Sequence, residues 1–308
     1  MPAFLCVYAG DYELDWPGHV FPVEKHRLLR ERLASSGRIP AEEWAEPGPA
    51  TRVELLRVHP ARYLDRLEAL ARARSPLAIA EFEAPLSSLV LDAVLRATGG
   101  TILAARRAAS GAVAVNLGGG FHHAFSDRGE GFCFVNDVAV AVRDVLALGL
   151  ARRVAVIDCD VHQGNGTARI FGGDTNVFTF SIHQENLYPP KARSTLDVGL
   201  EDGADDARYL RELDSALDRI AASFRPELAV YLAGADPFMN DQLGGLALTK
   251  SGLRERDRRV FGWARSLGIG VATCLAGGYA RRTQDVVDIH EATVMAALDS
   301  ARASADGR

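Results

Sequence analysis

The sequence predicts an α/β protein with a mainly parallel central sheet flanked by helices. Five short apolar runs do not alternate apolar with polar residues, as expected for strands that are buried on both faces. Between these runs, apolar residues recur three and four positions apart, which is typical of helices with one buried face. Strand and helix patterns therefore alternate along the chain, and this order favours one domain built on a parallel sheet.

The elements follow one another in a regular order. We expect strands at residues 111–116, 153–157, 176–181, 227–233 and 268–276. We expect helices around residues 24–34, 61–73, 86–109, 136–149, 205–223, 252–266 and 283–302. The side chain of Asn136 can cap its helix by accepting from a free backbone N–H. Residues 40–49, rich in Pro and Glu, are expected to form a surface loop rather than a domain boundary.

We predict a single domain over residues 1–308, with an ordered core to about residue 302 and a short C-terminal tail. The net charge of -5 argues against a general nucleic-acid binder, which would carry a basic stripe. The four cysteines are far apart and form no C-x-x-C pair, as expected for reduced thiols in a cytoplasmic protein. We recognise neither a secretion signal nor an uninterrupted apolar stretch that could span a bilayer.

The motif Asp158-Cys-Asp160-Val-His162 follows the predicted strand at 153–157. Every second residue of an extended strand faces the same side, so the two carboxylates and the imidazole project together. Burying such charges is costly unless an opposite charge compensates them. A divalent cation would do so, and this donor set suits a metal kept for chemistry. The alternative is a strand-end turn with solvated acids.

Reactive side chains also follow the other predicted strands, where ligands of parallel sheets bind. Asp236 would complete a set of two aspartates and one histidine with a position left open for water, unless it is only a turn acid. His122 and His123 follow three consecutive glycines and are candidates for acid–base chemistry. Tyr279 either packs as an aromatic residue or donates to a developing oxyanion.

With these motifs the chain resembles the zinc-dependent histone deacetylases and their bacterial relatives, from about His19 to the C-terminal helix. The resemblance rests on GGGFHHA (118–124), GFCFVND (131–137), DCDVHQGNG (158–166), FSIH (180–183), AGADP (233–237) and AGGY (276–279). It implies the arginase/deacetylase fold. The likeness is closest to the class IV branch because of the QGNG ending, the start YELDWPGHVFP (12–22) and the compact length.

The resemblance implies a role for each residue of the centre. The ligands of Zn²⁺, with Fe²⁺ as the alternative metal, would be Asp160, His162 and Asp236. The catalytic residues would be His122, His123 and Tyr279, with Asp158 and Asn165 in support. Asn165 stands where many members have an aspartate. Because an amide cannot stabilise an imidazolium as a carboxylate does, we expect a lower pKa for His123.

The resemblance also implies a cation site and a substrate tunnel. A structural K⁺ would be held by Asp158, Asp160, His162, Ser181 and the backbone of Ile182. The acyl-lysine tunnel would be lined by Gly131, Phe132, Tyr188, Leu243 and Gly277. Glu83 falls near the acidic residue at the rim of the family's tunnel.

The expected activity is zinc-dependent removal of acetyl or longer fatty acyl groups from lysine ε-amines of proteins or peptides. Three alternatives stay open: deacetylation of a small acetylated amine such as a polyamine, a dinuclear manganese ureohydrolase on the same fold, and a catalytically weak acyl-lysine binding protein. We expect no direct nucleic-acid binding and no membrane span. Acyl length, native substrate and oligomeric state are open at this point.

Overall fold

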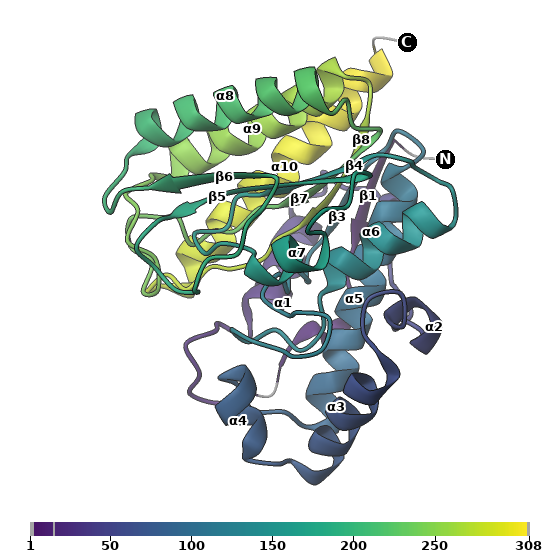
Figure 1. Ribbon diagram of the computed structural model, residues 1–308. Helices are drawn as coiled ribbons and strands as arrows, with labels where there is room; N and C mark the ends of the chain where they lie inside the picture. Colours follow the sequence, from purple (N-terminus) through teal and green to yellow (C-terminus); the bar gives the residue numbers. More distant parts are fainter. Residues whose placement is uncertain (1–2, 15, 307–308) are drawn as a thin grey trace.

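One sheet of eight strands organises the protein (Figure 1). The computed structural model describes residues 3–14 and 16–306. The strand order is β2-β1-β3-β8-β7-β4-β5-β6, and all the strand pairs described are parallel. The strands are β1 (Phe4–Val7), β2 (Trp44–Ala45), β3 (Val113–Asn116), β4 (Val154–Asp158), β5 (Val177–Gln184), β6 (Leu196–Leu200), β7 (Leu228–Leu232) and β8 (Gly270–Cys274).

The five predicted strands are confirmed as β3, β4, β5, β7 and β8, which form the buried centre of the sheet. The three strands that the prediction missed lie toward its edges. β6 alternates between exposed and half-buried residues, so it lacks the apolar run of a central strand. β2 lies within residues 40–49, so the prediction of a plain surface loop there is wrong.

Helices cover both faces of the sheet (Figure 1). One face packs against α1 (Lys25–Ser35), α8 (Asp206–Ser223), α9 (Lys250–Ser266) and α10 (Thr283–Asp306). The other packs against α5 (Ser88–Ala108) and α6 (Asp137–Ala147), while α3 (Ala61–Ala73) packs on the far part of α5. The strand β4 shows this division, because Ala155 and Ile157 join the first core cluster while Val154 and Val156 join the second.

The seven predicted helices are confirmed, with ends that shift by a few residues. The Asn136 side chain caps α6 as expected, accepting from the Ala139 N–H at 2.8 Å. The helix α10 continues to Asp306, four residues beyond its predicted end, whereas the extent of the domain stays a prediction. The prediction missed three short helices: α2 (Arg52–Leu55), α4 (Leu77–Phe82) and α7 (Asn165–Ile170).

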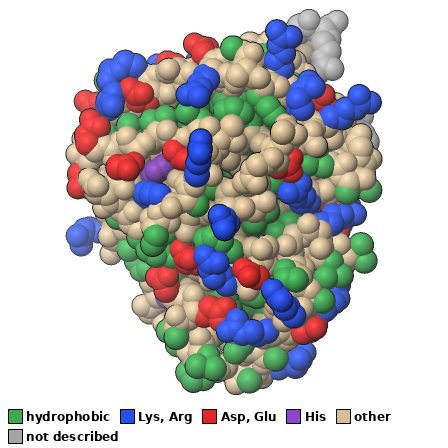
Figure 2. Space-filling view, viewed as in Figure 1, with side chains coloured by type: hydrophobic (Ala, Val, Ile, Leu, Met, Phe, Trp, Pro, Cys, Tyr) green, Lys and Arg blue, Asp and Glu red, His purple; other side chains and the backbone are tan. Residues whose placement is uncertain are grey.

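The helix α5 is long and apolar enough to cross a membrane by length and composition alone, and 61% of its most apolar window is buried inside the protein. It packs against α6, β3 and β8. On the face seen in Figure 2, basic and acidic side chains are intermixed and no continuous basic stripe appears.

The strand register brings four chain segments to one place. Asn116, Cys274, Leu232 and Asp158 lie side by side on the neighbouring strands β3, β8, β7 and β4. All four strands run in the same direction, so the loops that follow these residues meet at one edge of the sheet. These loops contain four of the sequence motifs described above: GGGFHHA, DCDVHQGNG, AGADP and AGGY.

Candidate active site

The loops after β4 and β7 place three potential metal ligands together. Ligand atoms of Asp160, His162 and Asp236 all lie within 4.8 Å of one another, and all three residues are buried. The His162 Nδ1 atom lies 3.1 Å from Asp160 Oδ1 and 3.4 Å from Asp236 Oδ2. Asp236 Oδ2 is buried and has no hydrogen-bond partner. An orphaned carboxylate oxygen inside such a donor set fits a bound divalent cation.

The electrostatics of this cluster also indicate a missing positive charge. Burial, together with the neighbouring carboxylate of Asp160, raises the pKa of Asp236 to about 7. Burial also opposes the charge of Asp160, but His122 and His162 outweigh it and lower the pKa of Asp160 below its usual value. The charge left incompletely stabilised is therefore that of Asp236, and a divalent cation would compensate it.

A glycine completes the enclosure of these carboxylates. The Gly277 N–H donates to Asp160 Oδ2 at 2.9 Å. A Cβ atom at position 277 would lie 2.1 Å from Asp236 Oδ2, so no other residue fits here without displacing a ligand.

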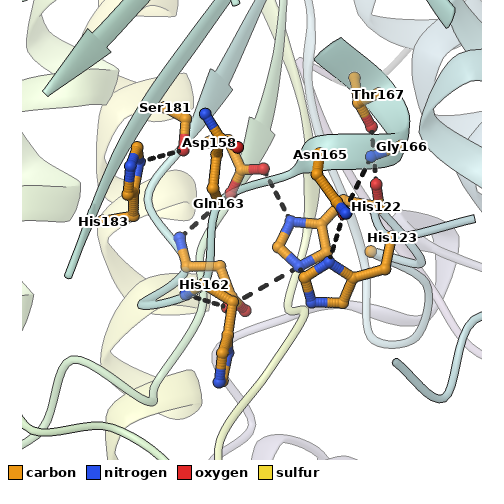
Figure 3. Close-up of polar contacts among 12 residues, drawn as sticks. His122, His123, Asp158, His162, Gln163, Asn165, Gly166, Thr167, Ser181 and His183 are labelled. Carbon is orange, nitrogen blue, oxygen red and sulfur yellow. Dashed lines mark hydrogen bonds and ion pairs between the residues drawn. The ribbon is translucent and has the colours of Figure 1, made fainter. Parts of the chain in front are cut away.

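Asp158 turns away from this cluster and supports the histidines (Figure 3). Its Oδ2 atom lies 2.7 Å from His122 Nδ1. In the register of β4 and β5, Asp158 also lies opposite Ser181, the residue before Ile182. The Ser181 hydroxyl in turn lies 2.9 Å from His183 Nδ1. The structure thus places two of the predicted K⁺ ligands, Asp158 and Ser181, side by side, while the ion and its full set of ligands stay predictions.

The two adjacent histidines have opposite electrostatic environments. Burial opposes the charged form of His122, but the carboxylates of Asp158 and Asp160 outweigh it and raise its pKa to about 9. Burial, with the charges of His122 and His162, lowers the pKa of His123 well below its usual value. At pH 7 this pairs a charged His122 with a neutral His123, and their Nε2 atoms are 3.2 Å apart.

The loop that carries both histidines is held by the start of α6. The Asp137 carboxylate accepts from the Gly120 N–H at 3.0 Å and from the Phe121 N–H at 2.7 Å. Gly120 has φ +87°, a left-handed conformation that glycine adopts without strain. Asn136 Nδ2 donates to the Ala124 carbonyl at 2.9 Å. The sequence motif contained both α6 residues, but nothing in the sequence pattern showed that they position the histidines.

Tyr279 faces the same site from the loop after β8. Burial, with the charges of Asp160 and Asp236, raises the pKa of its phenol well above the usual value, so the phenol stays protonated and can donate. Its backbone N–H donates to Asp241 Oδ2 at 2.7 Å. The buried Lys25 Nζ donates to the Ala276 carbonyl at 2.8 Å. The sequence analysis missed Asp241 and Lys25, which reach this loop from distant segments.

A cavity of about 50 Å³ leads to these groups. Its wall includes His122, His123, Asp160, His162 and Tyr279, together with Gly131, Phe132 and Gly277 of the predicted tunnel. Phe132 has φ +66°, a strained conformation for an aromatic residue, and its ring lies 4.6 Å from the ring of His19. His19, to which the sequence analysis gave no role, therefore supports the wall.

Two other predicted tunnel residues do not line this cavity. The Tyr188 ring lies 5.6 Å from the ring of His123, and its hydroxyl donates to Glu83 Oε1 at 3.0 Å. The structure therefore places the predicted rim acid beside a predicted tunnel aromatic. Leu243 is half-buried on the loop after Asp241, away from the cavity wall.

The sequence profile of the histone deacetylase domain matches residues 19–294 of the chain. The chain belongs to the histone deacetylase family. The predicted family is thereby confirmed, and with it a hydrolase that acts on amides. The family is metal-dependent, in agreement with the donor cluster of Asp160, His162 and Asp236. The likeness to the class IV branch stays a prediction.

Several relatives of this deacetylase-family chain are similar over most of their length. An uncharacterized protein of Picosynechococcus is 41% identical over 96% of this chain and 99% of its own. Histone deacetylase 2 of Arabidopsis thaliana is 33% identical over 91% and 76%, respectively. The histone deacetylase-like amidohydrolase of Pseudomonas aeruginosa is 32% identical over 85% and 73%.

A solved structure supports the predicted fold. The histone deacetylase homologue of Aquifex aeolicus superimposes with a TM-score of 0.81 over 94% of this chain and 82% of its own. At 24% sequence identity, this likeness concerns the fold alone. The expected arginase/deacetylase architecture is confirmed.

Proposed function

We propose that this protein is a zinc-dependent deacylase that removes acetyl or longer acyl groups from lysine ε-amines of proteins or peptides. One observation carries the proposal: a single narrow cavity joins two of the three metal donors, a charged and a neutral histidine, and a protonated phenol. Metal-assisted amide hydrolysis combines these groups: a Lewis acid, a base, and a donor for the oxyanion.

Asp160, His162 and Asp236 would hold the metal, with Fe²⁺ as the alternative to Zn²⁺. The bound metal would supply Lewis-acid chemistry, polarising the acyl carbonyl and making water acidic enough to attack at neutral pH. Gly277 keeps the backbone close to the two carboxylates, and Arg256 keeps the segments that carry them in place by donating to the carbonyls of Cys159 and Gly234.

His123 acts as the base in this proposal. It is neutral, so its Nε2 can accept the proton of the attacking water, and it can later return a proton to the leaving ε-amine. His122, charged through its pairing with Asp158, adds positive potential beside it. The Tyr279 phenol donates to the oxyanion of the tetrahedral intermediate.

The remaining predicted roles belong to the same proposal. Gly131, Phe132 and Gly277 line the cavity and would accompany the acyl-lysine side chain. Tyr188 and Glu83, which are hydrogen-bonded to each other, would lie at the rim, and Leu243 keeps no place in the cavity wall. A K⁺ ion held by Asp158, Asp160, His162, Ser181 and Ile182 stabilises the loop after β4. We further propose that the protein acts in the cytoplasm, as a single domain, on acylated peptides or proteins.

The proposal is tested with lysine peptides that carry acyl groups from acetyl to long-chain fatty acyl, together with an acetylated polyamine. Mass spectrometry would follow release of the free amine. We expect turnover of at least one acyl-lysine peptide and a clear preference for one acyl length. Turnover of the polyamine alone would identify a small-amine deacetylase. Binding of acyl-lysine without turnover would identify a binding protein.

A further inference from the structure

The amide of Asn165 has a second acidic neighbour beyond the histidine pair. Its Nδ2 atom donates to Glu130 Oε1 at 2.8 Å, while its Oδ1 atom lies 2.9 Å from His123 Nδ1. Glu130 precedes the Gly131 and Phe132 pair of the cavity wall, and neither the sequence motifs nor the family resemblance gave it a role. The histidine that serves as the proposed base is thus connected to a carboxylate through one intervening amide.

The orientation of this amide follows from partners whose own roles are unambiguous. A backbone N–H only donates, and the Gly166 N–H points to Asn165 Oδ1 at 3.0 Å. An ionised carboxylate only accepts, so Glu130 requires the NH₂ end of the amide. Since Oδ1 must then accept from His123, the proton of neutral His123 lies on Nδ1 and its Nε2 keeps the lone pair.

Together these groups form a row of polar contacts, part of which is seen in Figure 3. One hydrogen bond joins Asp158 to His122, and two more join His123 through Asn165 to Glu130, while the Nε2 atoms of the two histidines face each other at 3.2 Å. A carboxylate therefore stands at each end. The carboxylate that many family members place directly behind the second histidine is here one residue farther out.

The surroundings of Glu130 favour a role as the partner of Asn165 over a role in a surface ion pair. Its side chain is half-buried and, within the described residues, forms no salt bridge. Arg128 and Arg169 line the same groove as Glu130, but Arg128 stacks on the Phe125 ring and pairs with Asp127. By contrast, the buried Asp144 takes both Arg57 and Arg106 as partners. The one side-chain hydrogen bond described for Glu130 is the bond to Asn165.

We propose that Glu130 is a positioning residue for amide hydrolysis: its carboxylate fixes the Asn165 amide and thereby holds His123 as the tautomer whose Nε2 accepts a proton. The catalytic consequence rests on the proposed function, whereas the tautomer does not. Glu130 acts behind His123 and outside the cavity wall, so its loss affects kcat rather than KM. Loss of such an orienting partner typically costs ~10–100-fold in activity.

The test compares Glu130→Ala and Glu130→Gln with Asp127→Ala, an exposed acid of the same loop, as the control. Glutamine can still accept from Asn165 Nδ2 through its carbonyl, whereas alanine cannot. We expect kcat for an acyl-lysine peptide to fall ~10–100-fold in Glu130→Ala and less than about threefold in Glu130→Gln, with KM within about twofold in both. A Glu130→Ala variant with wild-type kcat, or a Glu130→Gln variant as impaired as Glu130→Ala, would overturn the proposal.

A second substitution, Asn165→Asp, should reverse the effect that Glu130→Gln has on kcat. In Asn165→Asp, the new carboxylate would face Glu130 at the distance of the present hydrogen bond, and like charges so close repel. Glu130→Gln should therefore raise kcat in the Asn165→Asp background although it slightly lowers kcat in the wild-type background. An equal loss in both backgrounds would show that Glu130 does not act through position 165.

The tautomer is read directly from ¹⁵N-histidine NMR spectra of the full-length protein. We expect the Nδ1–H form of His123 in the wild type and in Glu130→Gln, and a detectable share of the Nε2–H form in Glu130→Ala. An unchanged Nδ1–H tautomer in Glu130→Ala would overturn the proposal. If the wild type turned over no acylated amine, the proposed function would fail while these spectra would still decide the role of Glu130.

Discussion

Two of the buried clusters of charged side chains in the described part of the protein differ in whether opposite charges balance within the cluster. In the first, between α9, α10 and β7, Arg256 and Asp257 are both fully buried and lie 2.8 Å apart. The hydroxyls of Tyr231 and Thr293 donate to the two oxygens of Asp257 at 2.5 and 2.6 Å. One positive and one negative charge therefore cancel, although the Arg256 Nη2 atom pairs with Asp257 by charge and makes no hydrogen bond.

The second cluster, Asp160, His162 and Asp236, is not closed in this way. It holds two carboxylates, and one oxygen of Asp236 has no partner. Arg256 also reaches the loop that carries the second cluster, because its guanidinium donates to the Gly234 carbonyl, two residues before Asp236, at 2.6 Å. The difference shows that burial of charge alone does not mark a functional site, whereas a charge deficit inside a rigid set of donors does.

The largest expected effect is a loss of turnover on substitution in the cluster of Asp160, His162 and Asp236. Asp236→Asn removes one donor, so we expect loss of the bound metal and a fall in turnover on the order of 10³-fold or more. Because burial and Asp160 already disfavour the Asp236 charge, the thermal stability of the metal-free protein should be unchanged or higher. Metal analysis, turnover and thermal unfolding measure these outcomes. A metal-loaded variant with normal turnover would contradict the assignment.

An aspartate-to-asparagine substitution in the cluster of Arg256 and Asp257 should instead lower the free energy of unfolding. Asp257→Asn leaves the buried guanidinium of Arg256 without its counter-charge, which typically destabilises a protein by about 3–5 kcal/mol. Denaturant unfolding of the metal-free forms compares this variant with Asp236→Asn. If both variants unfolded at the wild-type midpoint, the distinction between the clusters would fail.

A smaller effect on turnover is expected at Tyr279, which lines the same cavity as Asp160 and His162. Tyr279→Phe removes the oxyanion donor but keeps the ring that lines the cavity, so turnover should fall by ~10²–10³-fold. Metal content and unfolding temperature should stay those of the wild type. Near-normal turnover in this variant would exclude Tyr279 as the donor.

The smallest effect concerns the pH dependence of the base. His123 works when neutral, so its pKa sets the acidic limb of the pH–rate profile. An aspartate at position 165 would stabilise the charged imidazole and raise that pKa, so in Asn165→Asp the acidic limb should move upward by roughly one pH unit. The profile of kcat/KM against pH measures the shift. An unchanged profile would contradict a role for residue 165 in setting the basicity of His123.

The parts of the site that follow strand ends were predictable from the sequence. The two-residue period of a strand explains why Asp158, Asp160 and His162 project together, and the parallel register explains why Asp236 and Tyr279 join them. The period alone would have placed Asp158 on the metal. The family resemblance instead predicted Asp158 as a support of His122, and in the structure it is bonded to His122 and lies opposite Ser181.

The supporting residues could not be predicted in this way. Lys25, Asp241 and Glu130 reach the site from segments that carry no strand-end pattern, and their roles depend on side-chain hydrogen bonds made in the folded protein. Similarly, β6 and β2 escaped prediction because strands toward the edge of a sheet need no continuous apolar run.

We propose that one divalent metal binds Asp160, His162 and Asp236 and that the protein then hydrolyses acyl-lysine amides. This proposal is tested most directly by following conversion of an acyl-lysine peptide to the peptide with a free lysine ε-amine after chelation and after stepwise return of Zn²⁺, with Asp236→Asn in parallel. We predict that chelation abolishes turnover in the wild type and that one equivalent of Zn²⁺ restores it, while the variant stays inactive throughout. Turnover that survives chelation, or that is equal in the variant, would contradict the account.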